Sequence, residues 1–161
     1  MMTTKFSKFL LSAILLLAAT IDVSALTLQE AVLGQSAPSR IGEMIPANDG
    51  ETYYALSDDH SKIVKRSYKT GEDVVVVFNS STARDCSIDY WNGFEVSEDE
   101  KTILLYTNKR LIYRHSFYAD YYTYDVRHNK LTKLSEKGGE EIATLSPDAR
   151  MVAFVKDNNL Y

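Results

Sequence analysis

The chain has 161 residues, a formal net charge of −4 at pH 7 and a hydrophobic fraction of 45%. A mildly acidic chain without clustered basic residues argues against nucleic acid and anionic lipid as partners. Cys86 is the only cysteine, so an intrachain disulfide is excluded, and a buried structural cysteine is the simpler interpretation.

The first 25 residues have the pattern of a signal peptide. Lys5 and Lys8 form a basic segment, the stretch 9–19 is almost entirely apolar, and residues 23–25 (VSA) are small, as a signal peptidase requires. The apolar stretch is about half of the ~20 residues that cross a bilayer, so cleavage is favoured over an uncleaved anchor. We therefore expect export, to the periplasm or as a secreted protein, after cleavage near Ala25.

Residues 26–50 are predicted to form a short N-terminal helix and an irregular lead-in. Thr27 can cap a helix over 27–34, Glu30 follows three residues later, and Gly34 ends the segment. Two of the three prolines and two glycines lie between residues 35 and 50, which favours irregular structure there.

Residues 51–161 contain three copies of one short phrase. Each copy reads apolar residue, Ser, any residue, Asp, and then an apolar residue four positions after the Asp. The serines, Ser57, Ser97 and Ser146, are 40 and 49 residues apart, which is close to the period of a β-propeller blade. A tight hairpin explains the phrase, because Ser and Asp side chains bond the backbone of turns. The predicted fold class is therefore all-β, a β-propeller of which the first two to three blades are present.

The expected strands follow in chain order. They cover 52–56, 62–68 and 73–78 in the first blade, 94–96, 102–106, 121–126 and 131–134 in the second, and 141–145 and 151–155 in the third. The run 74–78 (VVVVF) is β-branched and apolar, which indicates a strand buried on both faces. Because propellers close with 4–8 blades, we expect the chain to be the truncated front part of a longer protein.

Residues 107–120, between two strands of the second blade, are expected to form an insertion or an extended loop. The segment holds Lys109, Arg110, Arg114 and His115 among aromatic side chains. An arginine that stacks on aromatic rings is held rigid and can aim its donors at a carbonyl or carboxylate. A surface ion pair on a strand edge is the alternative, and such pairs are common.

The same segment resembles the dipeptidyl peptidase IV family, prolyl-oligopeptidase-type serine exopeptidases. The resemblance is clearest in one phrase, 113–117 (YRHSF), and extends over essentially all of residues 26–161. Its further segments are 122–126 (YTYDV), 146–148 (SPD), 151–155 (MVAFV) and 157–161 (DNNLY). The exported bacterial members look closer than the membrane-anchored animal ones.

This resemblance implies an eight-bladed propeller that caps a C-terminal α/β-hydrolase domain. Members of the family remove dipeptides from free N-termini and prefer proline or alanine as the second residue. Arg114 matches the propeller arginine that binds the substrate backbone carbonyl next to the cleaved bond. Peptides with a free N-terminus, the hydrolase domain and, in a homodimer, a second copy are the partners that the resemblance implies.

Catalysis by this chain alone is not expected, and no catalytic residue, cofactor or metal ligand is assigned. The pair Glu140-Glu141 is interpreted as solvated surface, because the family's paired glutamates belong to a later segment. Residues 34–38 (GQSAP) lack the final glycine of a G-x-S-x-G nucleophile turn. The three histidines, His60, His115 and His128, are scattered and form neither a triad nor a metal-binding spacing.

Two other interpretations remain open. The chain is alternatively a non-enzymatic propeller scaffold that binds peptides or proteins in the periplasm, since fold alone does not imply chemistry. Several copies of the chain are a further, less favoured route to a closed propeller. Asn79-Ser80-Ser81 is a glycosylation acceptor pattern, which matters only in a host that glycosylates.

Overall fold

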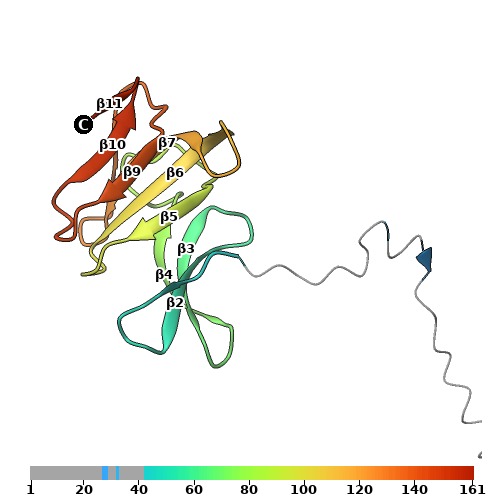
Figure 1. The fold of residues 1–161 in the computed structure, drawn as a ribbon. Helices are drawn as coiled ribbons and strands as arrows, with labels where there is room; N and C mark the ends of the chain where they lie inside the picture. Colours follow the sequence, from blue (N-terminus) through green and yellow to red (C-terminus); the bar gives the residue numbers. More distant parts are fainter. Residues whose placement is uncertain (1–26, 29–31, 33–41) are drawn as a thin grey trace, which may run out of the picture. The chain divides into compact units, whose positions relative to one another are not determined.

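The computed structural model describes residues 27, 28, 32 and 42–161. The predicted signal peptide, 1–25, and most of the predicted helix at 27–34 lie outside the described residues. Among the residues that are described, no helix is long and apolar enough to cross a membrane. All strands of the described residues belong to the unit Ile41–Tyr161, in which they form three separate sheets (Figure 1).

Each sheet is built from antiparallel strands that are consecutive in the sequence, as in a propeller blade. The first sheet contains β1 (Ile45–Pro46), β2 (Thr52–Leu56), β3 (Lys62–Ser67) and β4 (Asp73–Asn79). The second contains β5 (Gly93–Val96), β6 (Thr102–Leu111), β7 (Phe117–Asp125) and β8 (Lys130–Lys133). The third contains β9 (Ile142–Leu145), β10 (Val152–Lys156) and β11 (Asn159–Leu160). The predicted all-β, partial-propeller fold is confirmed.

The three Ser-x-Asp phrases form three nearly identical turns, as the sequence predicts. The Ser57 hydroxyl donates to Asp59 Oδ1 at 2.6 Å and accepts the Lys62 amide at 3.0 Å. The same two bonds recur around the other two serines, at 2.7 and 3.0 Å in both turns. The residue after each aspartate has a left-handed backbone, with φ of 58° at His60, 57° at Glu100 and 54° at Ala149.

The valine run of β4 is more exposed than its composition predicts. Val74, Val75 and Val76 are 57%, 49% and 53% exposed, so the prediction of a strand buried on both faces is wrong. β4 is the last strand of its sheet, and it pairs only with β3 among the described strands. An edge strand has a hydrogen-bonded neighbour on one side only, and in β4 only Phe78, near its end, is fully buried.

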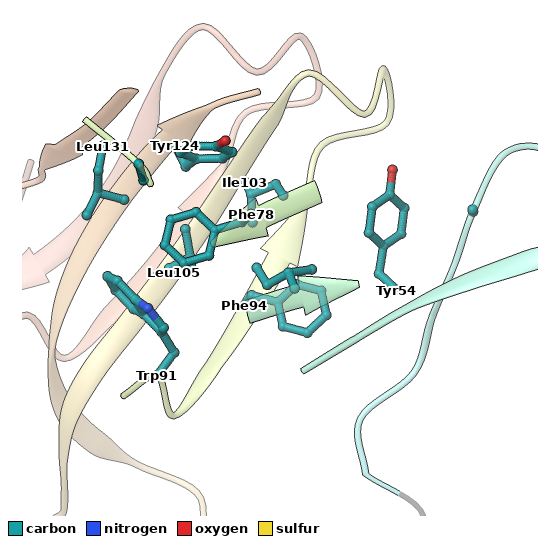
Figure 2. Packing of buried hydrophobic residues seen from close by; sticks show 11 residues of the cluster. Tyr54, Phe78, Trp91, Phe94, Ile103, Leu105, Tyr124 and Leu131 are labelled. Atoms are coloured by element: carbon teal, nitrogen blue, oxygen red, sulfur yellow. The ribbon is translucent and has the colours of Figure 1, made fainter. Parts of the chain in front are cut away.

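The main core lies between the first and second sheets and is dominated by aromatic rings (Figure 2). Phe78 is central, because its ring lies edge-on to Trp91 at 5.5 Å and to Tyr124 at 4.8 Å. The Trp91 indole N–H donates to Ser80 Oγ at 2.9 Å, so its one polar atom is satisfied. A smaller cluster around Leu104, Ala119 and Tyr121 packs against residues of β9 and β10.

Candidate functional site

The hairpin between β6 and β7 carries the sequence-predicted site residue. The expected insertion at 107–120 is for the most part a continuation of the two strands, since Arg110 pairs with Tyr118 and Leu111 with Phe117. Only residues 112–116 form the connection. The polar run 108–110 (NKR) breaks the apolar alternation at a shift of register between Thr107 and Arg110, which is why the sequence pattern ended the strand too early.

Hydrogen bonds fix the base of this hairpin from two sides. Asn108, with a left-handed φ of 54°, donates from Nδ2 to Asp120 Oδ2 at 2.8 Å. The other Asp120 oxygen accepts the Gly139 amide at 2.9 Å. Lys109 donates its amide to Asn92 Oδ1 at 3.0 Å. These hydrogen bonds therefore hold the register shift between Thr107 and Arg110 in one conformation.

Aromatic stacking holds the first two cations of the hairpin. The Lys109 ammonium lies 4.3 Å from the Phe117 ring centroid, and the Arg110 guanidinium lies 6.0 Å from that of Tyr118. Both distances are within the range of a cation–π interaction. Phe117 and Tyr118, two aromatic residues close to Arg114 in the sequence, thus contact Lys109 and Arg110.

Arg114 itself lies in the exposed connection at the tip of the hairpin. The Ser116 carbonyl closes this tip by accepting the amides of Ile112 at 2.9 Å and Tyr113 at 3.2 Å. Within the part of the chain that the structure describes, the Arg114 guanidinium has no hydrogen-bond or ion-pair partner. The surface ion pair considered as the alternative therefore does not form among these residues. Its five donors face solvent and are available to a ligand.

A cavity of about 530 Å³ opens beside the tip of the hairpin, and His115 and Ser116 form part of its wall. Its aromatic lining consists of Phe94, Tyr106, Phe117 and Tyr121, and its aliphatic lining comes from β1, β6 and β9. Three carboxylates complete the wall, those of Glu43, Glu95 and Glu141. No Lys or Arg of the described residues lines it.

Partial burial changes the acidity of the groups around the cavity. It raises the pKa of Glu43, an effect that the Lys109 ammonium partly offsets. It also raises the pKa of Glu95, although the Leu145 amide and the Thr144 hydroxyl donate hydrogen bonds to that carboxylate. Burial raises the pKa of Tyr121 to about 12. The cavity thus combines three carboxylates, of which Glu95 is half-buried, with aromatic walls beside the Arg114 hairpin.

Comparison with known proteins assigns this region. Residues 97–161 match the family model described as the dipeptidyl peptidase IV (DPP IV) N-terminal region. The crystal structure of Porphyromonas gingivalis dipeptidyl peptidase 4 superposes with a TM-score of 0.73 and 40% sequence identity, over 83% of this chain and 19% of that one. Residues 97–161 belong to the dipeptidyl peptidase IV N-terminal family, and the chain is similar to dipeptidyl peptidase 4 over most of its length.

Relatives among curated proteins agree with this assignment. The probable dipeptidyl peptidase 4 of Emericella nidulans is 32% identical over 84% of this chain and 17% of that protein. The probable dipeptidyl peptidase 4 of Aspergillus flavus is 31% identical over 71% of this chain and 14% of that protein. The dipeptidyl peptidase IV N-terminal region described here thus spans less than a fifth of the length of these relatives.

One residue of this dipeptidyl peptidase IV region differs clearly from its sequence-based interpretation. Glu140 is fully buried, so its assignment to the solvated surface is wrong. Its carboxylate accepts the Tyr121 amide at 3.3 Å and the Ser135 hydroxyl. Lys156 in turn donates to Ser135 Oγ at 2.9 Å. A charged residue is buried here because hydrogen bonds from two segments satisfy both of its oxygens.

The histidines of the region do not come together. His60 bonds the Trp91 carbonyl at 2.8 Å and stacks on Tyr90, whereas His128 bonds Asp125 at 2.8 Å. His115 lies on the cavity wall. In the described part of the chain, no group of three or more His, Cys, Asp or Glu side chains could hold a metal ion.

Sequence reasoning did not find the cavity glutamates. Glu95 alternates with Phe94 and Val96 in β5, and this period of two was a usable signal that one strand face carries a charge. Glu43 belongs to the lead-in before β1, where no periodicity marks a functional position.

Proposed function

We propose that this chain forms part of the substrate-gating propeller of an exported serine exopeptidase of the dipeptidyl peptidase IV type. In that enzyme Arg114 binds the backbone carbonyl of an extended peptide next to the cleaved bond. The proteolytic release of X-Pro or X-Ala dipeptides then takes place in an α/β-hydrolase domain, which holds the serine nucleophile. Peptides with a free N-terminus are the substrates.

The observation that carries this proposal is the state of Arg114. Its guanidinium has no partner among the described residues, yet the hairpin beneath it is fixed by hydrogen bonds at Asn108 and Asp120. A charged fork on a rigid support can hold a peptide carbonyl in one register at little entropic cost. A solvated arginine with a purely structural role would have no need of such a support.

Kinetics of the full-length enzyme test the proposal. Arg114→Ala should lower kcat/KM for a Gly-Pro chromogenic substrate by about 10- to 150-fold, because a hydrogen bond to a charged group contributes about 1.5–3 kcal/mol. Arg114→Lys should recover part of this loss, since lysine supplies a point charge without the planar fork. Arg127→Ala is the matched control, because Arg127 is an exposed arginine outside the hairpin. Wild-type kinetics in Arg114→Ala would overturn the proposal.

Peptide binding without catalysis is the second candidate. The exposure of Leu111 (72%) and Tyr113 (78%) beside Arg114 favours it, because exposed apolar side chains around a charged group are common in binding surfaces. This second candidate would be supported if the chain bound peptides and the full-length protein did not cleave them.

Export is part of the proposed function and rests on residues 1–25. A basic segment, an apolar stretch and small residues before position 26 support cleavage near Ala25. N-terminal sequencing of the protein recovered from the periplasm should begin at or near Leu26. A protein retained in the cytoplasm with Met1 or Met2 at its N-terminus would contradict the proposal.

A further inference from the structure

We infer that the cavity beside the Arg114 hairpin binds the side chain of a lysine or arginine in a bound peptide. The inference deepens the proposed function and rests on it, because it names the substrate side chain that this part of the propeller prefers. It assigns a second contact to the peptide besides the backbone carbonyl at Arg114.

The charges of the cavity favour a cation. Glu43, Glu95 and Glu141 line it, and no described Lys or Arg does. The Lys109 ammonium acts on Glu43 from outside the lining, so the negative charge is only partly compensated. His115 is the remaining titratable nitrogen on the wall. Glu95 is half-buried, and a carboxylate that has lost part of its water interacts more strongly with a cation than an exposed one does.

The aromatic walls fit the apolar stem of such a side chain. Tyr106 lies between Phe117 and Tyr121, with ring centroids 5.4 Å away in both directions. Lysine and arginine bury their methylene groups against apolar surface and keep the charged end near polar atoms. The Lys109 ammonium already lies over the Phe117 ring, so Lys109 competes with a bound cation for this wall.

The volume of the cavity and its location beside Arg114 also fit the side chain of a bound peptide. A volume of about 530 Å³ is within the usual range of cavities that hold small ligands. His115 and Ser116 follow Arg114 directly in the sequence and line the cavity. Because one extended residue spans about 3.3–3.6 Å, a peptide held at Arg114 can place a side chain one or two residues away in the cavity.

Calorimetric binding of short peptides to the full 161-residue chain tests this inference. The probes are tetrapeptides with a free N-terminus, in which one position at a time is lysine or its uncharged analogue norleucine. At one position the lysine peptide should bind at least about fivefold more tightly than the norleucine peptide, because one partly screened charge pair contributes a free energy of that order. No preference for lysine at any position would overturn the inference.

Four variants locate the preference. Glu43→Gln and Glu95→Gln should each reduce the ratio of the two affinities, whereas Lys109→Met should increase it by removing a competing cation. Glu72→Gln is the control, because Glu72 is an exposed carboxylate in the turn between β3 and β4 and lies outside the cavity. A ratio that is unchanged in both glutamine variants, with unfolding temperatures equal to wild type, would also refute the inference.

Arg114→Ala separates the two proposals. This variant should weaken the lysine and norleucine peptides equally and leave their ratio intact. An unchanged affinity for both peptides would contradict the role of Arg114 but not that of the cavity. If Glu43→Gln abolishes the preference for the lysine peptide while Arg114→Ala keeps normal peptidase kinetics, the cavity remains the site of the lysine side chain. The carbonyl contact of Arg114 is then overturned.

Discussion

The Lys65 ammonium in β3 lies 2.8 Å from Glu100 Oε2 in the turn between β5 and β6, and this ion pair joins the first sheet to the second. The other Glu100 oxygen accepts the Asn48 amide at 2.6 Å. Both side chains of the pair are about four-fifths buried, with 19% and 22% of their surface exposed. One carboxylate of the second sheet thus contacts the first sheet at two places, the turn between β1 and β2 and the strand β3.

Removing this pair should loosen the junction between the two sheets. Lys65→Met leaves the Glu100 carboxylate without its cation, and we expect a loss of about 1–3 kcal/mol in the free energy of unfolding. Urea unfolding would measure it. Lys101→Met is the control, because the Lys101–Asp99 pair is largely exposed and should change stability by less than about 0.5 kcal/mol. Equal effects of the two variants would contradict a special role for the junction.

Both the buried Trp91 side chain and its hydrogen bond to Ser80 should contribute to the free energy of unfolding. Trp91→Ala removes the largest fully buried side chain and should cost about 3–5 kcal/mol. Ser80→Ala should cost about 1–3 kcal/mol, because it leaves the buried indole N–H without an acceptor. Ser81→Ala, which alters an exposed hydroxyl next to it, should be nearly neutral. Thermal unfolding of the three variants should follow that order.

Replacing Glu140 should be far more damaging than replacing its neighbour. Glu140→Ala leaves the Tyr121 amide and the Ser135 hydroxyl without their acceptor, and we expect a loss of at least about 2 kcal/mol. Glu141→Ala, at a partly exposed position, should change stability much less. Chemical denaturation would show whether the two midpoints differ, and similar midpoints would be inconsistent with a structural role for Glu140.

The Ser-x-Asp turns should lose part of their stabilising effect in acid. Hydrogen bonds, first of all from Ser57 and Ser97, lower the pKa of Asp59 and of Asp99 to about 2, below the ordinary 3.8. Because the folded pKa values are depressed, both carboxylates stabilise the fold above about pH 4, and this contribution disappears as the pH falls towards 2. Ser97→Ala should raise the pKa of Asp99 and leave that of Asp59 unchanged. A carboxyl NMR titration would measure both.

A glycine should be preferred to alanine in the third turn. Ala149 has a left-handed φ of 54°, which costs a residue with a Cβ about 1 kcal/mol or more. Ala149→Gly should therefore stabilise the chain by up to about 1 kcal/mol, despite the greater freedom of glycine in the unfolded state. Ala153→Gly, in the extended β10, should destabilise it by about 0.5–1 kcal/mol. The two changes in unfolding midpoint should have opposite signs.

The repeat and the apolar pattern were sufficient to predict the blades. The strand at 52–56 was predicted with its observed bounds, and most other ends differ by one residue, because the turn chemistry at Ser57, Ser97 and Ser146 is local. The exposure of Val74–Val76 could not be read from the residues, since a buried central strand and an outer edge strand can have the same composition.

The candidate site was predictable only in part. The motif at 113–117 singles out Arg114, whose role stays a prediction, and the structure adds that Phe117 and Tyr118 contact Lys109 and Arg110. Glu140 looked like surface because its hydrogen-bond donors, the Tyr121 amide and Ser135, are 19 and five residues away. Contacts of this kind depend on the packing of strands and have no local signature.

The determinants of each Ser-x-Asp turn lie within six consecutive residues, from the serine to the residue whose amide donates back to its hydroxyl. Such a turn needs nothing from the neighbouring sheet to close. A gene segment that encodes one blade could therefore be duplicated or lost while each copy still made its own hairpin. The facing surfaces, with their ion pairs and aromatic contacts, would be the part that had to adapt afterwards.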